Sequence, residues 1–144
     1  MKRLEIVNPE ELGRPSGFSH GLVAPAGARV LFVAGQTAPE AGDRESGSAE
    51  AAADRLVAQF EAALERALAV VRGAGGGPAD VARLTVYVTD MEAYRSARPR
   101  LGGVWRATMG HHYPAMALVE VRALVDPNAV VEIEATAVLP DEPR

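Results

Sequence analysis

The sequence contains no cysteine, few aromatic residues and no long apolar run. The absence of cysteine excludes disulfide bonds, thiolate zinc sites and a cysteine nucleophile, and it is typical of an intracellular protein. No apolar segment approaches the length of about 20 residues that a membrane-spanning helix needs. The N-terminal segment MKRLEIVNPEEL also lacks the apolar core of a signal peptide. We therefore expect a soluble, cytoplasmic protein with no membrane partner.

Positive charge is scarce as well. The chain has 15 Lys and Arg residues against 19 Asp and Glu residues, and its formal net charge is −4. A weakly acidic chain gains little from counterion release on a phosphate backbone. Aromatic residues make up only 5% of the sequence, so no stripe for stacking nucleic-acid bases is visible. Nucleic acid is therefore not the expected partner, and we expect the arginines between positions 95 and 106 to be solvated on a helix face.

What remains is an ordinary globular composition. The chain has 144 residues, of which 48% are hydrophobic and 24% charged. This length suits a single domain spanning residues 1–144, with a core built mostly from alanine, valine and leucine.

Apolar periodicity predicts the order of the elements. We expect a strand at 29–34, a helix at 49–72 that begins after a Ser48 cap, a strand at 83–89, a helix near 91–109, and strands at 116–123 and 130–138. Proline removes a helical hydrogen bond, and glycine adds entropy to the unfolded chain. Pro99, Gly102 and Gly103 therefore predict a second helix that breaks or restarts near Pro99. The order of elements predicts an α+β fold, in which two helices pack on one face of a mixed β-sheet.

The second face of this sheet is expected to be unusual. Alternation places Val130, Glu132 and Glu134 on one face of the last strand. The preceding strand is expected to place Met116, Leu118, Glu120 and Arg122 on the same face of the sheet. Such a face is too apolar for simple solvent exposure and too charged for the core of a monomer. A subunit interface that contains a polar pocket satisfies both conditions, which predicts an oligomer.

Four segments together resemble the signature blocks of the RidA (YjgF) family. They are VLFVAGQT at 30–37, VYVTDME at 86–92, YPA at 113–115 with VEV at 119–121, and VEIEA at 131–135. Their order and spacing match, and the resemblance runs from about Gly17 to Val138. It implies a homotrimer whose sheets form an inner β-barrel, with pockets in the clefts between subunits. The same overall fold occurs in a bacterial type of chorismate mutase.

The resemblance also implies a chemistry. Active family members hydrolyse 2-aminoacrylate-type enamines and imines to 2-keto acids and ammonia, without a metal or an organic cofactor. Some relatives are labelled endoribonuclease L-PSP. The family's glutamate, thought to position a water at the C=N group, corresponds to Glu132, which makes Glu132 the candidate catalytic residue. The glycine of the first strand block is retained as Gly35.

Three other pocket positions depart from the family pattern. The arginine that binds the substrate carboxylate bidentately is replaced by Met116. Phe18 stands where a tyrosine hydroxyl is expected, and Arg98 stands where an asparagine is expected. Losing the arginine should cost several kcal/mol of substrate binding. We therefore expect the standard deaminase activity to be impaired in a remodelled pocket.

Each remaining candidate has a functional and a structural interpretation. Ser19 and His20 follow Phe18 in the segment expected to line the cleft, and a histidine there can transfer protons near neutral pH or simply lie at the surface. Arg98 can supply a replacement guanidinium or be an ordinary solvated arginine. Glu132 can act on water or pair with an arginine at the subunit interface. Without cysteine and without a His-x-x-x-His helix, we expect no metal site.

Two functions stay open at this point. The first is a divergent hydrolase that acts on an imine or another small carbonyl-type metabolite. The second is a non-catalytic small-molecule binder on the same trimer, in which Met116 and Phe18 hold a less polar ligand. An endoribonuclease is a third alternative, and the acidic net charge argues against it.

Overall fold

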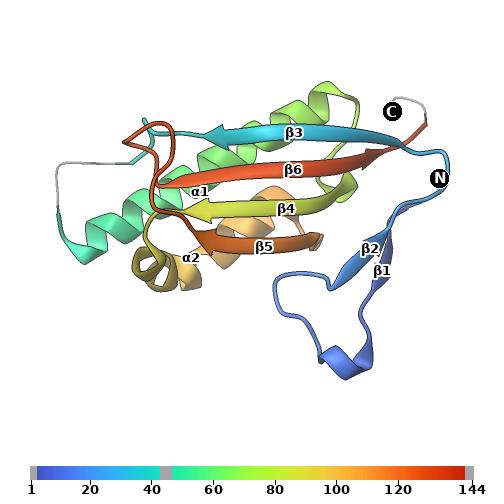
Figure 1. The fold of residues 1–144 in the computed structure, drawn as a ribbon, viewed down its shortest axis with the longest axis horizontal. Helices are drawn as coiled ribbons and strands as arrows, with labels where there is room; N and C mark the ends of the chain where they lie inside the picture. Colours follow the sequence, from blue (N-terminus) through green and yellow to red (C-terminus); the bar gives the residue numbers. More distant parts are fainter. Residues whose placement is uncertain (1–2, 43–46, 142–144) are drawn as a thin grey trace.

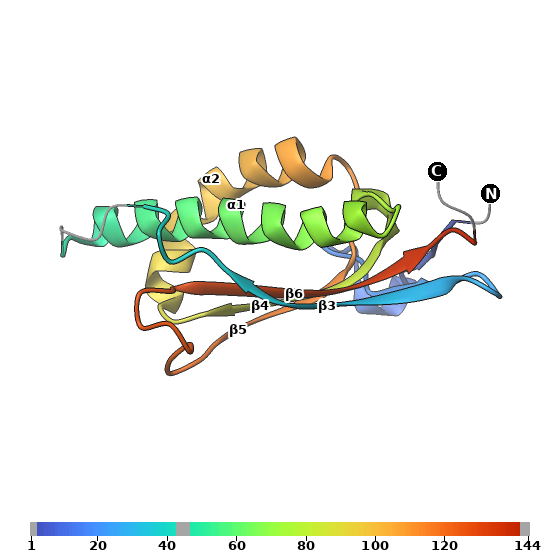
Figure 2. The same cartoon turned by 90° about the horizontal axis from the view of Figure 1, so that it is seen from above.

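The computed structural model describes residues 3–42 and 47–141. The elements in chain order are β1 (Glu5–Val7), η1 (Glu10–Leu12), β2 (Gly21–Val23), β3 (Arg29–Thr37), α1 (Ala49–Gly73), η2 (Pro78–Asp80), β4 (Val81–Val88), α2 (Met91–Met109), β5 (Ala115–Glu120) and β6 (Val131–Leu139). Both helices pack on one face of a four-stranded sheet (Figure 2). Nothing in the described part of the chain forms a layer on the other face.

The sheet is mixed, with the strand order β3-β6-β4-β5. Strand β6 pairs antiparallel with β3 and with β4, whereas β4 and β5 are parallel and are joined through α2. The predicted α+β fold, with two helices on one face of a mixed sheet, is confirmed. The short β1-β2 hairpin lies beyond the end of the sheet where β5 begins (Figure 1). It was not predicted, because strands of three residues show too little alternation.

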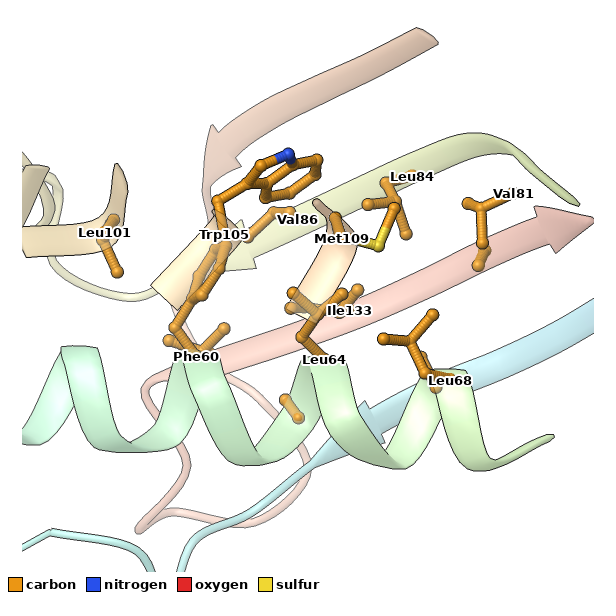
Figure 3. Close-up of a cluster of buried hydrophobic side chains, with 14 of the residues drawn as sticks. Phe60, Leu64, Leu68, Val81, Leu84, Val86, Leu101, Trp105, Met109 and Ile133 are labelled. Carbon is orange, nitrogen blue, oxygen red and sulfur yellow. The ribbon is translucent and has the colours of Figure 1, made fainter. Parts of the chain in front are cut away.

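Helix α1 forms as its sequence predicts. The Ser48 hydroxyl accepts a hydrogen bond from the backbone N–H of Ala51 and caps the helix. Apolar residues then recur every three or four positions, and Phe60, Leu64 and Leu68 are buried against the sheet. Figure 3 shows these side chains facing Ile133 of β6 and the apolar residues of β4. The core therefore lies between the helices and one sheet face.

Helix α2 corrects one prediction. It runs unbroken from Met91 to Met109, so the expected break near Pro99 is wrong. Pro99 and Arg95 both lie on the exposed side, where solvent can satisfy the carbonyl that proline leaves without its N–H partner. The Asp90 side chain caps the helix by accepting from the N–H of Ala93, and Leu101 with other apolar residues is buried. Tertiary packing thus outweighs local propensity.

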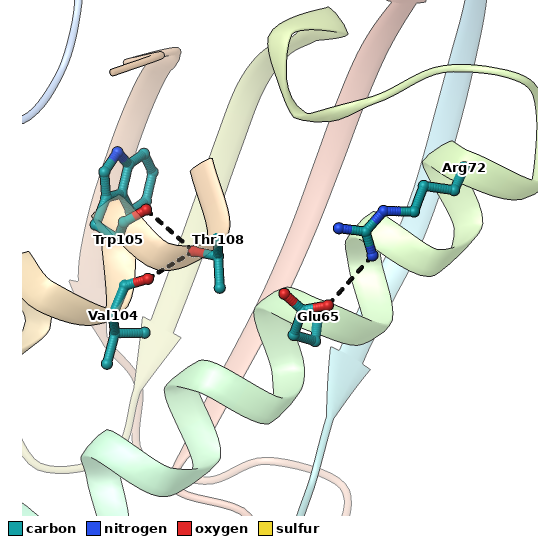
Figure 4. Close-up of polar contacts among 5 residues, drawn as sticks. All are labelled: Glu65, Arg72, Val104, Trp105 and Thr108. Carbon is teal, nitrogen blue, oxygen red and sulfur yellow. Dashed lines mark hydrogen bonds and ion pairs between the residues drawn. The ribbon is translucent and has the colours of Figure 1, made fainter. Parts of the chain in front are cut away.

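The buried polar side chain of α2 is hydrogen-bonded within the helix. The buried Thr108 hydroxyl donates to the carbonyl oxygens of Val104 at 2.8 Å and Trp105 at 3.2 Å (Figure 4). On the outer side of α1, Glu65 and Arg72 form a surface ion pair at 3.2 Å, also drawn in Figure 4. Such a pair contributes little to stability because both side chains are solvated.

Strand β5 corrects two further predictions. It ends at Glu120 rather than Ala123, so Arg122 lies beyond the strand. Its parallel register pairs Leu84 with Met116 and Val86 with Leu118. Because directly paired residues point to the same side of a sheet, Met116 and Leu118 face the helices and not the open face.

Glu120 follows the same register, because it pairs with Val88. Its carboxylate accepts a hydrogen bond from the backbone N–H of Met91 at 2.9 Å, at the start of α2. The sequence pattern gives the alternation within one strand, whereas the pairing between strands decides which face each set occupies. The expected placement of Met116, Leu118 and Glu120 beside Glu132 is therefore wrong.

Candidate functional site

Glu132 and Gly35 lie against each other on the open sheet face. Between Val33 and Gln36, strand β3 carries one extra residue relative to β6, which is the geometry of a β-bulge. A Cβ placed on Gly35 would lie 1.9 Å from Oε1 of Glu132 and 2.8 Å from its Cδ. Only a residue without a side chain allows the carboxylate to lie this close to the backbone of β3. The two retained positions of the family pattern therefore form one structural unit.

Glu132 differs from the other carboxylates of these strands in its hydrogen bonding. Glu134, on the same face, accepts a hydrogen bond from the Tyr87 hydroxyl at 2.7 Å, and Glu120 is held by the start of α2. The Glu132 carboxylate makes no hydrogen bond or ion pair with any residue in the described ranges, although its residue is half-buried. It is therefore available to a ligand or a water molecule.

Tyr87 was missed by sequence reasoning. It pairs directly with Glu132 in the β4-β6 register, so both side chains lie on the open face. The hydrogen bond to Glu134 raises the pKa of Tyr87, partial desolvation adds to the shift, and the negative charges of Glu134 and Glu132 raise it further, against a smaller opposing effect from Arg83. The carboxylates of Glu132 and Glu134 therefore both lie near the Tyr87 hydroxyl on the open face. The sequence offers one sign of this position, because Tyr87 alternates with the buried Leu84, Val86 and Val88 along β4.

The N-terminal candidates lie elsewhere, in the loop between β1 and β2. Ser19 is buried, and it binds the start of β5 twice: its hydroxyl donates to the carbonyl of Tyr113 at 2.6 Å and its N–H to that of Pro114 at 3.1 Å. His20 is held within the loop, because its N–H donates to Oδ1 of Asn8 at 2.7 Å and its Nε2 lies 3.2 Å from the carbonyl oxygen of Gly13. Ser19 and His20 therefore shape the loop.

Phe18 is half-buried and packs edge-on against the His20 ring, with ring centroids 5.2 Å apart. Together with Ser19 and Tyr113 it lines a groove of 590 Å³. The groove also contains Arg14, a residue that sequence reasoning missed because a lone arginine beside a proline carries no motif. Phe18 therefore belongs to a concave surface at the β5 end of the sheet.

Met116 and Arg98 are not close to Glu132 within one chain. Met116 pairs with Leu84 on β4, three residues from Tyr87, the partner of Glu132. Three residues along a strand and two strand spacings across give a separation of roughly 14 Å between the Met116 and Glu132 backbones, and the side chains lie on opposite faces. Arg98 is exposed on α2, on the helix side of the sheet. One chain therefore does not bring all the predicted site residues together.

Two classes of feature are absent from residues 3–42 and 47–141. No helix there is long and apolar enough to cross a membrane. No group of three or more histidine and carboxylate side chains in these ranges is arranged to hold a metal ion.

Comparison with known proteins identifies the family. The model of the family described as endoribonuclease L-PSP matches residues 12–139. A Yersinia pestis protein of unknown function, YyfB of the conserved Rid family, is 31% identical, with 96% of this chain and 100% of that chain covered and a TM-score of 0.68. A Mycobacterium tuberculosis member of the YjgF/YER057c/UK114 family is 30% identical, with 94% and 99% covered and a TM-score of 0.57.

A curated relative agrees with these structures. A RutC family protein of Pyrococcus horikoshii is 29% identical over 136 residues, which is 92% of this chain and 96% of the relative. The family match, these relatives and the helices packed on a mixed sheet lead to one conclusion: the chain belongs to the endoribonuclease L-PSP family, the RidA/YjgF group.

Proposed function

We propose that this chain forms a homotrimer that binds a small imine- or carbonyl-type metabolite between its subunits, and that Glu132 positions the water that hydrolyses it. The observation that carries the proposal is the Glu132 carboxylate, which is unpartnered among the described residues and lies over Gly35 on an open sheet face. A half-buried carboxylate without a protein partner is suited to hold and deprotonate water.

The separation of the candidate residues supports a site built from two chains. Glu132 and Gly35 lie at one end of the sheet, whereas Phe18 and Met116 lie near the start of β5. The open face also exposes large apolar side chains, with Phe32 at 80% and Val30 at 53%. Apolar surface of this kind favours burial by another copy, and we propose a head-to-tail cyclic arrangement in which the Glu132 end of one subunit meets the Phe18 end of its neighbour.

The proposed reaction is balanced by water alone. The oxygen of a water molecule adds to the imine carbon while Glu132 accepts one of its protons. That proton passes to the nitrogen, which gives a carbinolamine. Glu132 then takes the remaining hydroxyl proton and passes it to the nitrogen, so the C–N bond breaks as the C=O bond forms, and the products are a carbonyl compound and ammonia. No oxidant, reductant or metal is needed.

A non-catalytic small-molecule binder is the second candidate. It is favoured by Met116, which packs partly buried against the core where the family pattern has a guanidinium. Phe18 likewise replaces a hydroxyl by an apolar ring edge. Both changes favour a ligand that is less polar than the family's usual substrates, and they remove groups that hold such substrates for reaction.

Turnover assays separate the two candidates. Iminopropionate would be generated in situ and pyruvate release measured for the wild type, Glu132→Gln, Met116→Arg and the control Glu61→Gln, which changes an exposed carboxylate on α1. We expect slow wild-type turnover that is lost in Glu132→Gln, kept in Glu61→Gln and increased in Met116→Arg. An arginine on the edge strand β5 can pack its stem on the core and extend its guanidinium past the edge.

Each other result has a defined meaning. Equal turnover in wild type and Glu132→Gln contradicts the catalytic role of Glu132. Ligand binding without turnover in any variant supports the non-catalytic candidate. Wild-type turnover equal to that of an arginine-bearing relative shows that the site is not impaired. Light scattering reports the trimer, and degradation of RNA by the purified protein would favour a ribonuclease instead.

A further inference from the structure

The loop between β1 and β2 is fixed firmly enough to form a binding surface. Ser19 ties it to the carbonyl oxygens of Tyr113 and Pro114. Asn8 and Gly13 hold the backbone and ring of His20 from within the loop. The loop is therefore held at the start of β5 by side chains and backbone together, and its concave side has a defined shape.

This groove has one sign of charge. Its volume of 590 Å³ is in the range of small-molecule sites. Among the described residues that line it, Arg14 is the charged one, and no carboxylate is present. The Arg14 guanidinium makes no hydrogen bond or ion pair within residues 3–42 and 47–141. In a chain whose net charge is −4, a cationic groove without a counter-charge is suited to an anionic ligand.

A second cleft, larger than this groove, offers a contrast. It measures 810 Å³ and lies between the hairpin and the far end of β6. Its lining combines Arg3 with Asp80 and Asp141, so it carries one more negative charge than positive charges. That cleft gives no comparable preference for an anion.

The other residues that line the Arg14 groove indicate which further groups a ligand should carry. The Oδ1 atom of Asn8, another lining residue, already accepts from His20, so its amide nitrogen remains to donate to a ligand. Phe18 and Tyr113 provide aromatic surface. The Tyr113 ring is itself held in place by stacking on Trp105, with centroids 6.1 Å apart and planes 4° from parallel.

We infer that this groove binds small organic carboxylates with an apolar side chain, and that Arg14 is the residue that recognises the carboxylate. The inference rests on the proposed small-molecule function for its choice of ligand size, and it names the group that takes the place of the strand arginine. Tyr113, one of the residues that line the groove, precedes Met116 by three residues. The guanidinium is therefore supplied by the N-terminal loop at nearly the same end of β5, and Arg98 has no part in it.

A matched pair of ligands tests the charge requirement. The probes are 4-methylpentanoate and its amide, which have the same shape and differ in charge. Binding is followed by saturation-transfer NMR and by the fluorescence of Trp105, the single tryptophan, which stacks on a wall of the groove. We expect the wild type to bind the acid about tenfold more tightly than the amide, as for a charged hydrogen bond at an exposed site. Added salt should narrow that difference.

The variants are Arg14→Gln, Arg98→Gln and the control Arg106→Gln, all at exposed positions, so folding is preserved and is checked by circular dichroism. We expect Arg14→Gln to bind the acid no better than the amide, while the other two variants bind like the wild type. Unchanged acid binding in Arg14→Gln, or its loss only in Arg98→Gln, overturns the inference. The turnover of Glu132→Gln tests only the proposed catalytic function. If the protein binds the carboxylate through Arg14 but no variant shows turnover, the catalytic proposal fails and the Arg14 site is still supported.

Discussion

Replacing Gly35 by alanine tests whether the contact with Glu132 is the reason for the glycine. The added Cβ would lie 1.9 Å from Oε1 of Glu132 and 3.1 Å from its Cγ, so the carboxylate must move. Gly35 is not among the glycines with positive φ, and alanine therefore meets no backbone strain there. The atoms in conflict belong to the far end of a flexible side chain, which can rotate away.

Two opposing effects set the magnitude. Alanine in place of a strand glycine stabilises the fold by about 0.5–1 kcal/mol, because it lowers the entropy of the unfolded chain. Forcing Glu132 off its preferred rotamer costs about 0.5–1.5 kcal/mol. Gly35→Ala should therefore change the free energy of unfolding by less than about 1 kcal/mol in the wild type. In a Glu132→Ala background the conflict is gone, and the same change should stabilise by about 0.5–1 kcal/mol.

Urea denaturation of the four proteins in this double-mutant cycle gives the coupling free energy. All four are compared at one protein concentration, because oligomer stability depends on concentration. We expect a coupling of about 0.5–1.5 kcal/mol, together with reduced imine turnover in Gly35→Ala as the carboxylate is displaced. Equal effects of Gly35→Ala in both backgrounds would refute the reasoning, because they would show that the glycine is not required by Glu132.

Three further predictions concern the frame and the electrostatics of the sheet. Pro99→Ala should stabilise the protein by about 1–3 kcal/mol in urea denaturation, since the exposed side of α2 regains a hydrogen bond; destabilisation would mean that Pro99 has a packing role. Gln59→Leu should destabilise by about 2–4 kcal/mol, because the fully buried amide binds two backbone groups of the segment before β6; an unchanged midpoint would show that water replaces it. Because the pKa of Tyr87 is raised in the native state, its protonated hydroxyl adds to the free energy of unfolding. This contribution is fully present below about pH 10 and is lost as the pH rises through the higher native pKa. Glu134→Gln should lower that pKa in a tyrosinate absorbance titration, with Tyr87→Phe assigning the signal, and an unchanged titration would contradict the hydrogen bond as its cause.

The sequence was sufficient for the layers of the fold because they depend on local periodicity. The α1 pattern and its Ser48 cap predict the helix to within about one residue, and the strand alternation separates Ile133 from Glu132 correctly. The break at Pro99 was predicted from propensity alone, and packing of the buried face of α2 outweighs it. The β1-β2 hairpin depends on tertiary contacts, such as that of Ser19, that no local pattern contains.

For the candidate site, the limit of sequence reasoning lies in the pairing of strands. Resemblance carries Gly35 and Glu132 to this chain, and their close contact agrees with both being retained. Met116 was placed on the wrong face because the β4-β5 register is a non-local property. Arg14 could not be selected from the sequence, because its importance comes from the absence of any counter-charge in a groove formed by distant segments.

The three departures from the family pattern do not form one cluster, and this bears on how the pocket has changed. Met116 packs against the core at the edge of the sheet, Arg98 is exposed on the outer helix, and Phe18 lines the groove that contains Arg14. Arg98 lies on the exposed side of α2 and is not among the residues that line that groove. Phe18 and Arg14 line one groove, so a ligand that binds there as we propose would meet both the apolar ring and the guanidinium. A carboxylate with an apolar side chain would suit both groups at once, whereas a small polar substrate would suit the guanidinium alone.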